Sequence, residues 1–466
     1  MPHKKIFILL PDGIGLRNFA FTNFYSIGFK RGFDIVFWNN TPFDLDKIDF
    51  KEIKIHKAKS HPITDFLKKA QVKIELSQNK KKAKDAVYDS YIFPQKPKDF
   101  KLLLKLFIIN GIVFINNSQK GLIRIRKSIA QKERKTKLYF DSLATLQIER
   151  PDMVFCTNQR ITLAVAPILA AQDLGIPTAT FIFSWDNLPK GTKIIETDFY
   201  FVWSEYMKNE LMYYYPYVKE NQIFITGTPQ FEPHFNKNLL KDKEVFFNEN
   251  KLDCNKRYIC FSGDDSTTSP NDPQYLADTV KAIRFLNDKG YNLGIIFRRC
   301  PVDFSTRFDA VIDNNGDIIT SINPKWEKIG EEWNTILPTK EDMILQMNTI
   351  FYSELVINLG SSMVFDYVAH QKPCGFINYD VPNNSLSNWT VKKIYNYIHF
   401  RSMPTKEAVF WINSADEIAN VIEKMLSDES QKVVKNAQKW FEIINKHAAE
   451  SASERIWDAI AEITNK

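Results

Sequence analysis

Cysteine and histidine are scarce, and neither is spaced as in a typical metal site or disulfide framework. The 466 residues include five cysteines, which are scattered and form no CxxC pair. The seven histidines show no HxxxH or HExxH spacing. We therefore expect reduced, buried thiols and no structural or catalytic zinc site, and we expect no cofactor.

Long hydrophobic runs are also missing. The longest apolar stretch, residues 102–115, is interrupted by Lys105 and Asn110, and a membrane-spanning helix needs about 20 residues. The first residues lead into a strand-like segment without the features of a signal peptide. The chain is 44% hydrophobic and 25% charged, the balance of a globular protein. These features predict a cytoplasmic protein, and its length predicts two domains.

Acidic residues are few in one segment. Residues 96–137 contain twelve basic and two acidic residues, a net charge of +10, whereas the whole chain has a net charge of +7. Apolar residues lie among these lysines, as in a helix that lies on an anionic membrane surface. A helix that packs its apolar face on the core and leaves its lysines in solvent explains the pattern equally well. No recognition motif accompanies the charge, so nucleic acid is not expected as a partner.

Short apolar segments alternate with helical stretches, a pattern that predicts a parallel α/β sheet and that occurs twice along the chain. We predict an N-terminal domain over residues 1–235, a polar linker over 236–255, a second domain over 256–428 and C-terminal helices over 429–466. The expected strands are Lys5–Leu10, Asp34–Trp38, Met153–Thr157, Thr178–Phe183, Asp198–Trp203, Gln222–Thr226, Arg257–Ser262, Asn292–Phe297, Glu354–Asn358 and Cys374–Asn378.

The strongest motif follows the predicted strand Glu354–Asn358. Gly360-Ser361-Ser362 leads into a helix, and Asp366 lies about one turn further on. Free backbone N–H groups and hydroxyls at the start of a helix suit a phosphate. Asp366 could accept hydrogen bonds from a ribose. The alternative is that the two serines only cap the helix and the aspartate is solvated.

Two other predicted strands end in sequences that suit a ligand. Thr226-Gly-Thr-Pro229 makes a sharp exit from a strand, although a simple turn would also account for it. Arg298 and Arg299 follow the predicted strand Asn292–Phe297. Ligands bind beyond the carboxyl ends of strands in open α/β sheets, and arginine suits phosphate.

Together these features resemble the GT-B superfamily of glycosyltransferases, over nearly the whole chain. Within it, the sequence is most similar to bacterial enzymes of surface-polysaccharide assembly. Polyol-phosphate transferases of teichoic-acid synthesis and non-hydrolysing sugar-nucleotide 2-epimerases share similar elements. The resemblance implies two Rossmann-like domains facing a cleft, with the C-terminal helices crossing back to the first domain. It also implies that no metal is required.

The resemblance assigns the second half of the chain to a nucleotide-sugar donor. Serines after a glycine would hold the diphosphate, a carboxylate would bind the ribose, and an arginine would neutralise the departing phosphate. Many members of the superfamily have glutamate at the ribose position, where this chain has aspartate. The implied donor-binding residues are Gly360, Ser361, Ser362, Asp366, Arg298, Ser262 and Gly263.

The first half would then supply the acceptor site and the catalytic base. For an inverting enzyme, Asp12 or Asp186 would take the proton from the acceptor hydroxyl. Both lie in loops that follow predicted strands, where a capping aspartate or a buried tryptophan beside a turn would be the structural explanation. The implied acceptor-binding residues are Gly13, Gly15, Arg17, Asn18, Trp185 and Asn187.

We therefore expect a glycosyltransferase that moves a sugar from a nucleotide-sugar to a surface glycan or lipid-linked acceptor. It would be peripheral at the inner membrane face, with the basic segment against anionic lipid. Three alternatives stay open. A polyol-phosphate transferase would rely on histidines, and His234 and His370 lie near the motifs. A sugar-nucleotide epimerase would need no acceptor, and a non-catalytic sugar- or nucleotide-binding protein would show no turnover.

Overall fold

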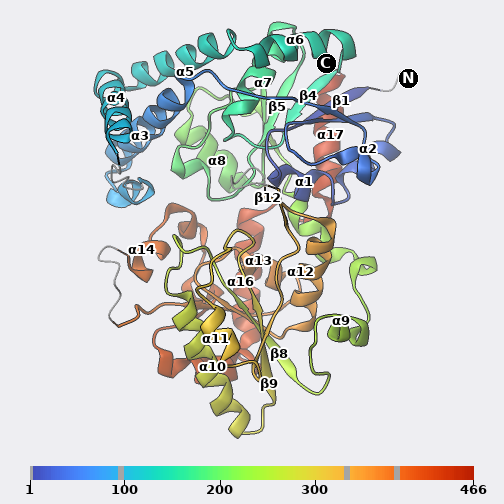
Figure 1. Cartoon of the computed structure of the whole chain (residues 1–466), viewed down its shortest axis with the longest axis vertical. Helices are drawn as coiled ribbons and strands as arrows, with labels where there is room; N and C mark the ends of the chain where they lie inside the picture. Colours follow the sequence, from blue (N-terminus) through green and yellow to red (C-terminus); the bar gives the residue numbers. More distant parts are fainter. Residues whose placement is uncertain (1–3, 93–98, 330–335, 383–388, 466) are drawn as a thin grey trace. The chain divides into compact units, whose positions relative to one another are not determined.

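The computed structural model describes residues 4–92, 99–329, 336–382 and 389–465. The chain forms two compact units, Met1–Pro229 with Ile444–Lys466 and Gln230–Ile443. Each unit contains one large sheet with helices around it (Figure 1). The predicted α/β fold with two Rossmann-like domains is confirmed.

The first unit is built on a seven-stranded parallel sheet in the order β3-β2-β1-β4-β5-β6-β7. Its central strands are almost continuously buried, as expected for a parallel sheet with helices on both faces. The strand order reverses between β1 and β4. The strands are β1 (Lys5–Leu10), β2 (Asp34–Asn39), β3 (Glu52–Lys54), β4 (Met153–Cys156), β5 (Thr178–Phe181), β6 (Phe199–Val202) and β7 (Ile223–Ile225).

The helices of this unit include a group formed by the long insertion between β3 and β4. The basic segment 96–137 forms most of α4 and α5, and its residues 96–98 lie outside the described residues. The helices are α1 (Ile14–Phe19), α2 (Phe24–Lys30), α3 (Thr64–Ala83), α4 (Phe100–Asn116), α5 (Gln119–Glu133), α6 (Lys137–Glu149), α7 (Val165–Asp173) and α8 (Glu205–Tyr214).

The end of the chain belongs to the first unit through α17 (Ala452–Thr464). The ring of Trp457 is fully buried and stacks on Phe24 and Phe33, with both pairs of ring centroids 4.7 Å apart. Its indole N–H donates to the main-chain oxygen of Phe24 at 2.8 Å. This helix therefore completes the core of a domain whose other residues lie more than 200 positions earlier.

The second unit has a six-stranded sheet in the order β10-β9-β8-β13-β14-β15, also parallel. Here the order reverses between β8 and β13. The strands are β8 (Arg257–Ser262), β9 (Leu293–Arg298), β10 (Ile319–Ser321), β13 (Val356–Asn358), β14 (Cys374–Ile377) and β15 (Phe410–Ile412), and a separate antiparallel pair is β11 (Glu327–Lys328) with β12 (Ile336–Leu337).

The segment expected to be a linker, 236–255, is part of this second unit. Phe246 and Phe247 in α9 (Lys243–Glu249) and Leu252 are buried in a cluster with Tyr258 and Ile296. The charged residues around them made the stretch look solvated. The other helices of the unit are α10 (Asp272–Asp288), α11 (Asp309–Asp313), α12 (Lys340–Tyr352), α13 (Met363–Val368), α14 (Val391–Tyr395), α15 (Ile418–Met425) and α16 (Ser430–Ile444).

The predicted C-terminal segment 429–466 divides between the two units. In α16, Trp440 and Phe441 pack on Phe365 of the second unit, with ring centroids 4.8 and 5.9 Å away. Only the residues from Ile444 onward belong to the first unit. The five cysteines are all free, as expected, but Cys254 is exposed and Cys300 half-buried, so the expectation of buried thiols holds only for the other three.

Candidate functional site

The reversal of strand order in the first sheet places two polar residues side by side. Asp12 lies two residues after β1, and Asn158 lies two residues after β4. The Asn158 amide donates to Oδ2 of Asp12 at 2.7 Å, and both side chains are 1% exposed. The other oxygen of Asp12, Oδ1, accepts no hydrogen bond from a described side chain, although the backbone N–H groups of Ile14 and Gly15 lie close enough to the carboxylate to lower its pKa. Such a reversal is where open α/β sheets bind ligands.

Burial raises the pKa of Asp12 to about 6, while the Asn158 hydrogen bond and the nearby Arg160 charge counteract part of this rise. At neutral pH the carboxylate is therefore mostly ionised, with a proton affinity suited to a general base. Asn158 and Arg160 were not among the predicted site residues. The sequence feature that could have indicated them is the polar run Thr157–Arg160 directly after a buried strand.

The glycines after Asp12 have a packing role in the structure. Gly13 precedes α1, and a Cβ added at Gly15 would lie 2.4 Å from Oγ1 of Thr157. Only glycine lets α1 approach β4 this closely. Asn18 is buried and Arg17 half-buried. Their expected contact with an acceptor stays a prediction.

The second candidate for the base, Asp186, is held in hydrogen bonds within its own loop. It accepts from Oγ of Ser184 at 2.5 Å and from the amide of Asn187 at 2.7 Å, and it forms an ion pair with Lys190. Asn187 is 2% exposed and also accepts from Gln159 at 3.0 Å. Trp185 is 6% exposed. The loop is thus rigidly bonded, and its carboxylate is less free to accept a proton than Asp12.

In the second sheet, the reversal lies between β8 and β13, and both strand ends carry the predicted donor residues. Ser262 ends β8 with Gly263 after it, and Gly360 follows β13 with a left-handed φ of 68°. Oγ of Ser361 accepts from the N–H of Met363 at 3.3 Å. Ser362 makes no hydrogen bond through its own hydroxyl or amide N–H to any described residue. One of the two serines therefore caps the helix, and the other keeps its donors available.

An aspartate follows β8 at the same distance as Asp12 follows β1. Burial, together with the charges of Asp265 and Asp272, raises the pKa of Asp264 to about 8. This carboxyl group is therefore mostly protonated at neutral pH. Arg307 donates to the main-chain oxygen of Asp264 at 2.5 Å and to that of Ser269 at 2.7 Å, which fixes the loop after β8.

Arg298 lies at the end of β9, where it was expected, but it is 4% exposed and bound to a carboxylate. Its Nη2 donates to both oxygens of Asp342 at 2.8 Å. Asp342 also accepts from the indole of Trp326 at 2.7 Å. Nη1 of Arg298 has no hydrogen-bond partner among the described residues. The ion pair joins β9 to α12, and a contact between Arg298 and a leaving phosphate stays a prediction.

Asp366 is part of a small buried cluster with two histidines. Its Oδ1 lies 2.8 Å from Nε2 of His234, and Nδ1 of His234 lies 3.1 Å from Nε2 of His370. Burial, with the neighbouring His234, lowers the pKa of His370 to about 4. The predicted ribose contact of Asp366 stays untested, and one of its oxygens is already occupied by His234.

No group of three or more His, Cys, Asp or Glu side chains in the described part of the chain is arranged to hold a metal ion. No helix within the described ranges combines the length and hydrophobicity needed to cross a bilayer.

The fold is shared with solved structures, although sequence identity is low. MnaA of S. aureus, solved with UDP, has a TM-score of 0.53 and 13% identity, and the match covers 99% of this chain and 97% of MnaA. A putative UDP-N-acetylglucosamine 2-epimerase from Listeria monocytogenes has a TM-score of 0.55 and 12% identity, with 99% and 96% covered. A glycosyltransferase from Rickettsia africae has a TM-score of 0.50 and 11% identity, with 99% of each chain covered. No family model and no curated protein matches the sequence. These likenesses confirm the GT-B type of fold.

Proposed function

We propose that this chain is a glycosyltransferase that moves a sugar from a nucleotide-sugar donor to a hydroxyl of a glycan or lipid-linked acceptor. The observation that carries the proposal is Asp12, a buried carboxylate where the strand order of the first sheet reverses, with one oxygen that no described side chain contacts and a pKa raised to about 6. A transferase that inverts the anomeric centre needs such a base to activate the acceptor hydroxyl. The proposed base is therefore Asp12 and not Asp186.

The donor is assigned to the second unit by the same topological argument. Small residues, Gly263, Gly360 and Ser362, lie where the strand order of its sheet reverses. Asp264 beside them is mostly protonated. A neutral carboxyl group does not repel a diphosphate as a carboxylate would. Similar folds include one solved with UDP and one described as a UDP-N-acetylglucosamine 2-epimerase. These likenesses support a nucleotide-sugar as substrate, and UDP as its first nucleotide to test.

In the proposed reaction, the acceptor oxygen forms a bond to the anomeric carbon while the bond from that carbon to the nucleotide diphosphate breaks. Asp12 takes the hydroxyl proton, and the diphosphate leaves with the bonding electrons. In this proposal, the hydroxyl and N–H of Ser362 donate to the charge that develops on the leaving group. The proposal needs no metal, so chelation with EDTA is expected to leave transfer unchanged.

A thermal-shift panel with UDP, GDP, CDP, dTDP, ADP and CMP tests the donor site. A ligand at ~100 times its dissociation constant stabilises the folded chain by ~2.7 kcal/mol, so a selective shift by one diphosphate supports the proposal. Incubation with the matching nucleotide-sugar alone then separates transferase from epimerase. Release of free nucleotide supports transfer to water or acceptor, whereas a changed sugar still attached to the nucleotide indicates epimerisation. No shift with any nucleotide would contradict the proposal.

The cluster of Asp366, His234 and His370 favours a second candidate, a polyol-phosphate transferase. His234 lies 2.8 Å from Asp366 and 3.1 Å from His370, and such a chain of groups is suited to moving a proton in phosphoryl transfer. A double variant, His234→Ala with His370→Ala, separates the two candidates. A glycosyltransferase is expected to keep most of its activity, whereas a polyol-phosphate transferase would lose it and would respond to CDP or CMP.

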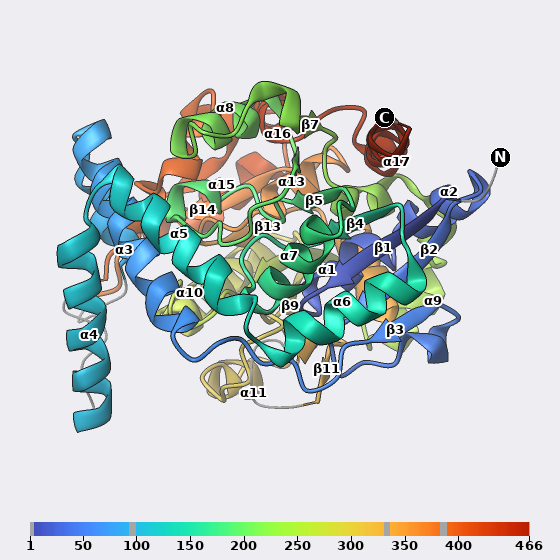
Figure 2. The ribbon, with the colours of Figure 1, turned by 90° about the horizontal axis from the view of Figure 1, so that it is seen from above.

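We also propose that α4 rests on an anionic membrane, where a lipid-linked acceptor would lie. Figure 2 shows α4 at the edge of the first unit beside α3, and its inner residue Ile109 is 1% exposed in the core. α4 contains two lysines and no acidic residue. Its outer stripe consists of seven large apolar side chains that are 42–88% exposed: Phe100, Leu103, Leu104, Phe107, Ile108, Phe114 and Ile115.

Such a stripe beside lysines is typical of helices that lie in a lipid interface. Flotation with vesicles containing anionic lipid tests it. The variant Phe107→Ser with Phe114→Ser is expected to stay unbound. Phe29→Ser with Ile148→Ser removes similarly exposed side chains from other helices and is expected to float like the wild type. Equal flotation of both variants would contradict the assignment of α4.

A further inference from the structure

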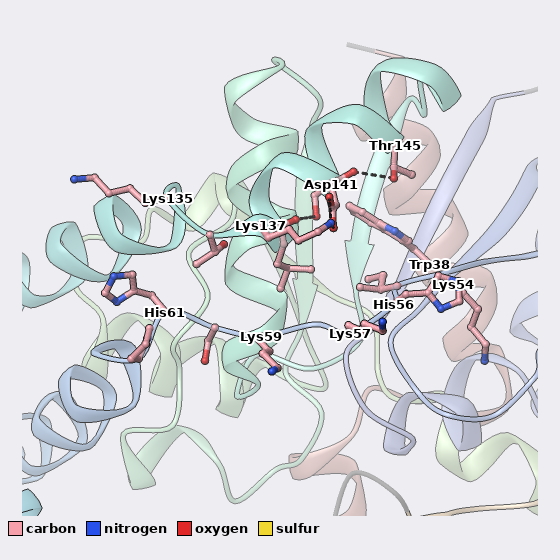
Figure 3. Close-up of a pocket in the computed structure, with 16 residues that line it drawn as sticks. Trp38, Lys54, His56, Lys57, Lys59, His61, Lys135, Lys137, Asp141 and Thr145 are labelled. Carbon is pink, nitrogen blue, oxygen red and sulfur yellow. Dashed lines mark hydrogen bonds and ion pairs between the residues drawn. The ribbon is translucent and has the colours of Figure 1, made fainter.

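The first unit contains a pocket of about 1030 Å³ whose lining includes none of the residues assigned to the proposed reaction. It lies between the loop after β3, residues 55–62, and the beginning of α6 (Figure 3). Trp38 of β2 forms part of its wall. Its volume is in the range of small-molecule binding sites.

The lining of this pocket carries positive charge that no acidic residue neutralises. Lys57, Lys59 and Lys135 form no ion pair or side-chain hydrogen bond with any described residue. Lys137 is paired with the one acidic lining residue, Asp141, at 2.6 Å. Three of the five lysines that line the pocket are therefore unpaired, and Figure 3 shows Lys135 extending away from Lys57 and Lys59.

Lys54, the fifth lysine of the lining, is already paired with acidic residues. It lies 3.4 Å from Asp44 and 3.6 Å from Glu52. His56 and His61 also line the pocket and add ring nitrogens without a fixed charge. The unpaired charge thus belongs to Lys57 and Lys59, in the loop after β3, and to Lys135.

The loop that carries two of these lysines is tied down at both ends. At its start, the N–H of Ile55 donates to the main-chain oxygen of Asn39 at 2.8 Å. At its end, the N–H of His61 donates to the buried Glu133 at 2.9 Å. Between them, Lys57 has a φ of 51°, a left-handed conformation that is uncommon for a residue other than glycine. The main chain of this loop is therefore fixed at both ends by hydrogen bonds that do not involve its lysine side chains.

We propose that this pocket binds a ligand that carries two linked phosphate groups. Lysine is a point-charge partner of phosphate, and a single phosphate at neutral pH carries about −1.5 to −2 charges. Three unpaired lysines match a diphosphate better than one phosphate. Apolar lining residues, Trp38, Ile55 and Leu138, would contact an uncharged part of the same ligand.

The pocket lies beside the strand that leads to the proposed base. Trp38 pairs in register with Leu9 of β1, three residues before Asp12. In the proposed transferase, the diphosphate held here belongs to the acceptor. This identification rests on the proposed function, whereas the binding of a diphosphate does not.

Isothermal titration with inorganic pyrophosphate tests the site, with and without saturating UDP to separate it from the donor site. The variant Lys57→Ala/Lys59→Ala/Lys135→Ala is expected to bind pyrophosphate at least ~10-fold more weakly than the wild type. The matched control Lys30→Ala/Lys219→Ala/Lys446→Ala removes the same charge from exposed positions of the same unit and is expected to bind like the wild type.

The proposal is overturned if the wild type does not bind pyrophosphate, if UDP displaces all of it, or if both triple variants weaken binding equally. A wild type that binds pyrophosphate in the pocket but no nucleotide would refute the proposed donor site and leave this one standing. Vesicles of zwitterionic lipid with and without a polyprenyl diphosphate then identify the source. Retention of the wild type and the control but not of the pocket variant assigns a lipid-linked ligand, and retention of none assigns a soluble one.

Discussion

The two sheets place an aspartate at the same point and give it opposite properties. Asp12 and Asp264 each lie two residues after the first strand of their unit, beside the reversal of strand order. The pKa of Asp12 is raised to about 6 and that of Asp264 to about 8, in both cases mainly by burial. At neutral pH, the first is mostly ionised and the second mostly protonated.

The neighbours of the two aspartates explain the difference. Asp12 accepts a hydrogen bond from Asn158 and is near Arg160, and both favour its charged form. Asp264 is near Asp265 and Asp272, which disfavour it. In the proposed function, one topological position provides a base in one unit and a neutral lining for an anion in the other.

The largest effect is expected from Asp12→Asn. Asparagine keeps the hydrogen bond with Asn158 but cannot take a proton, so transfer is expected to fall by ~10²–10⁴-fold. Nucleotide affinity is expected to be unchanged, because the donor residues lie in the other unit. The matched change, Asp264→Asn, is expected to leave transfer within a few-fold of the wild type. Equal loss of activity in the two variants would contradict the assignment of the base to Asp12 alone.

A second effect concerns stability, and it depends on pH. Between about pH 4 and about pH 8, the unfolded chain ionises Asp264 while the folded chain keeps its proton, so the wild type loses stability as the pH rises. Asp264→Asn removes this loss. Its free energy of unfolding is expected to exceed that of the wild type by a few kcal/mol at pH 8, at ~1.4 kcal/mol per pKa unit.

Urea denaturation of both proteins at pH 4.5 and pH 8 measures the gain, which is expected to shrink at the lower pH. Asp272, whose pKa is raised to about 7, titrates in both proteins and largely cancels in the difference. A gain that is the same at both pH values would show that Asp264 is not protonated in the folded state.

The smallest effect is expected from Ser362→Ala. Removing one hydroxyl donor to a phosphate is expected to weaken nucleotide binding by about 0.5–1.5 kcal/mol, which is ~2–10-fold in the dissociation constant. Ser361→Ala is the comparison, because that hydroxyl already accepts from Met363. Ser361→Ala is expected to lose helix stability with little change in nucleotide affinity. Calorimetric titration measures the nucleotide affinity of both variants. The reverse result would exchange the roles of the two serines.

Much of the fold was predictable from sequence. All ten predicted strands are present, because buried parallel strands appear as short apolar runs. The edge strands β3, β10 and β15, of three residues each, were not predicted. The supposed linker was misassigned because its core residues, Phe246, Phe247 and Leu252, stand among charged ones.

The site was predicted less completely than the fold. Sequence placed Asp12 and Gly360-Ser361-Ser362 at strand ends, and the structure confirms these positions. It could not show that Asp366 contacts His234, because that contact joins residues 132 positions apart. Nor could it distinguish Asp12 from Asp186, since hydrogen bonding and burial, and not spacing, make them different.

The pH dependence of sugar transfer tests the central claim most directly. With Asp12 as the base, kcat/KM is expected to be constant above about pH 6 and to fall tenfold per pH unit below it. The Asp264→Asn variant is expected to show the same profile. A profile that stays flat well below pH 6, or one that shifts when Asp264 is replaced, would contradict Asp12 as the catalytic base.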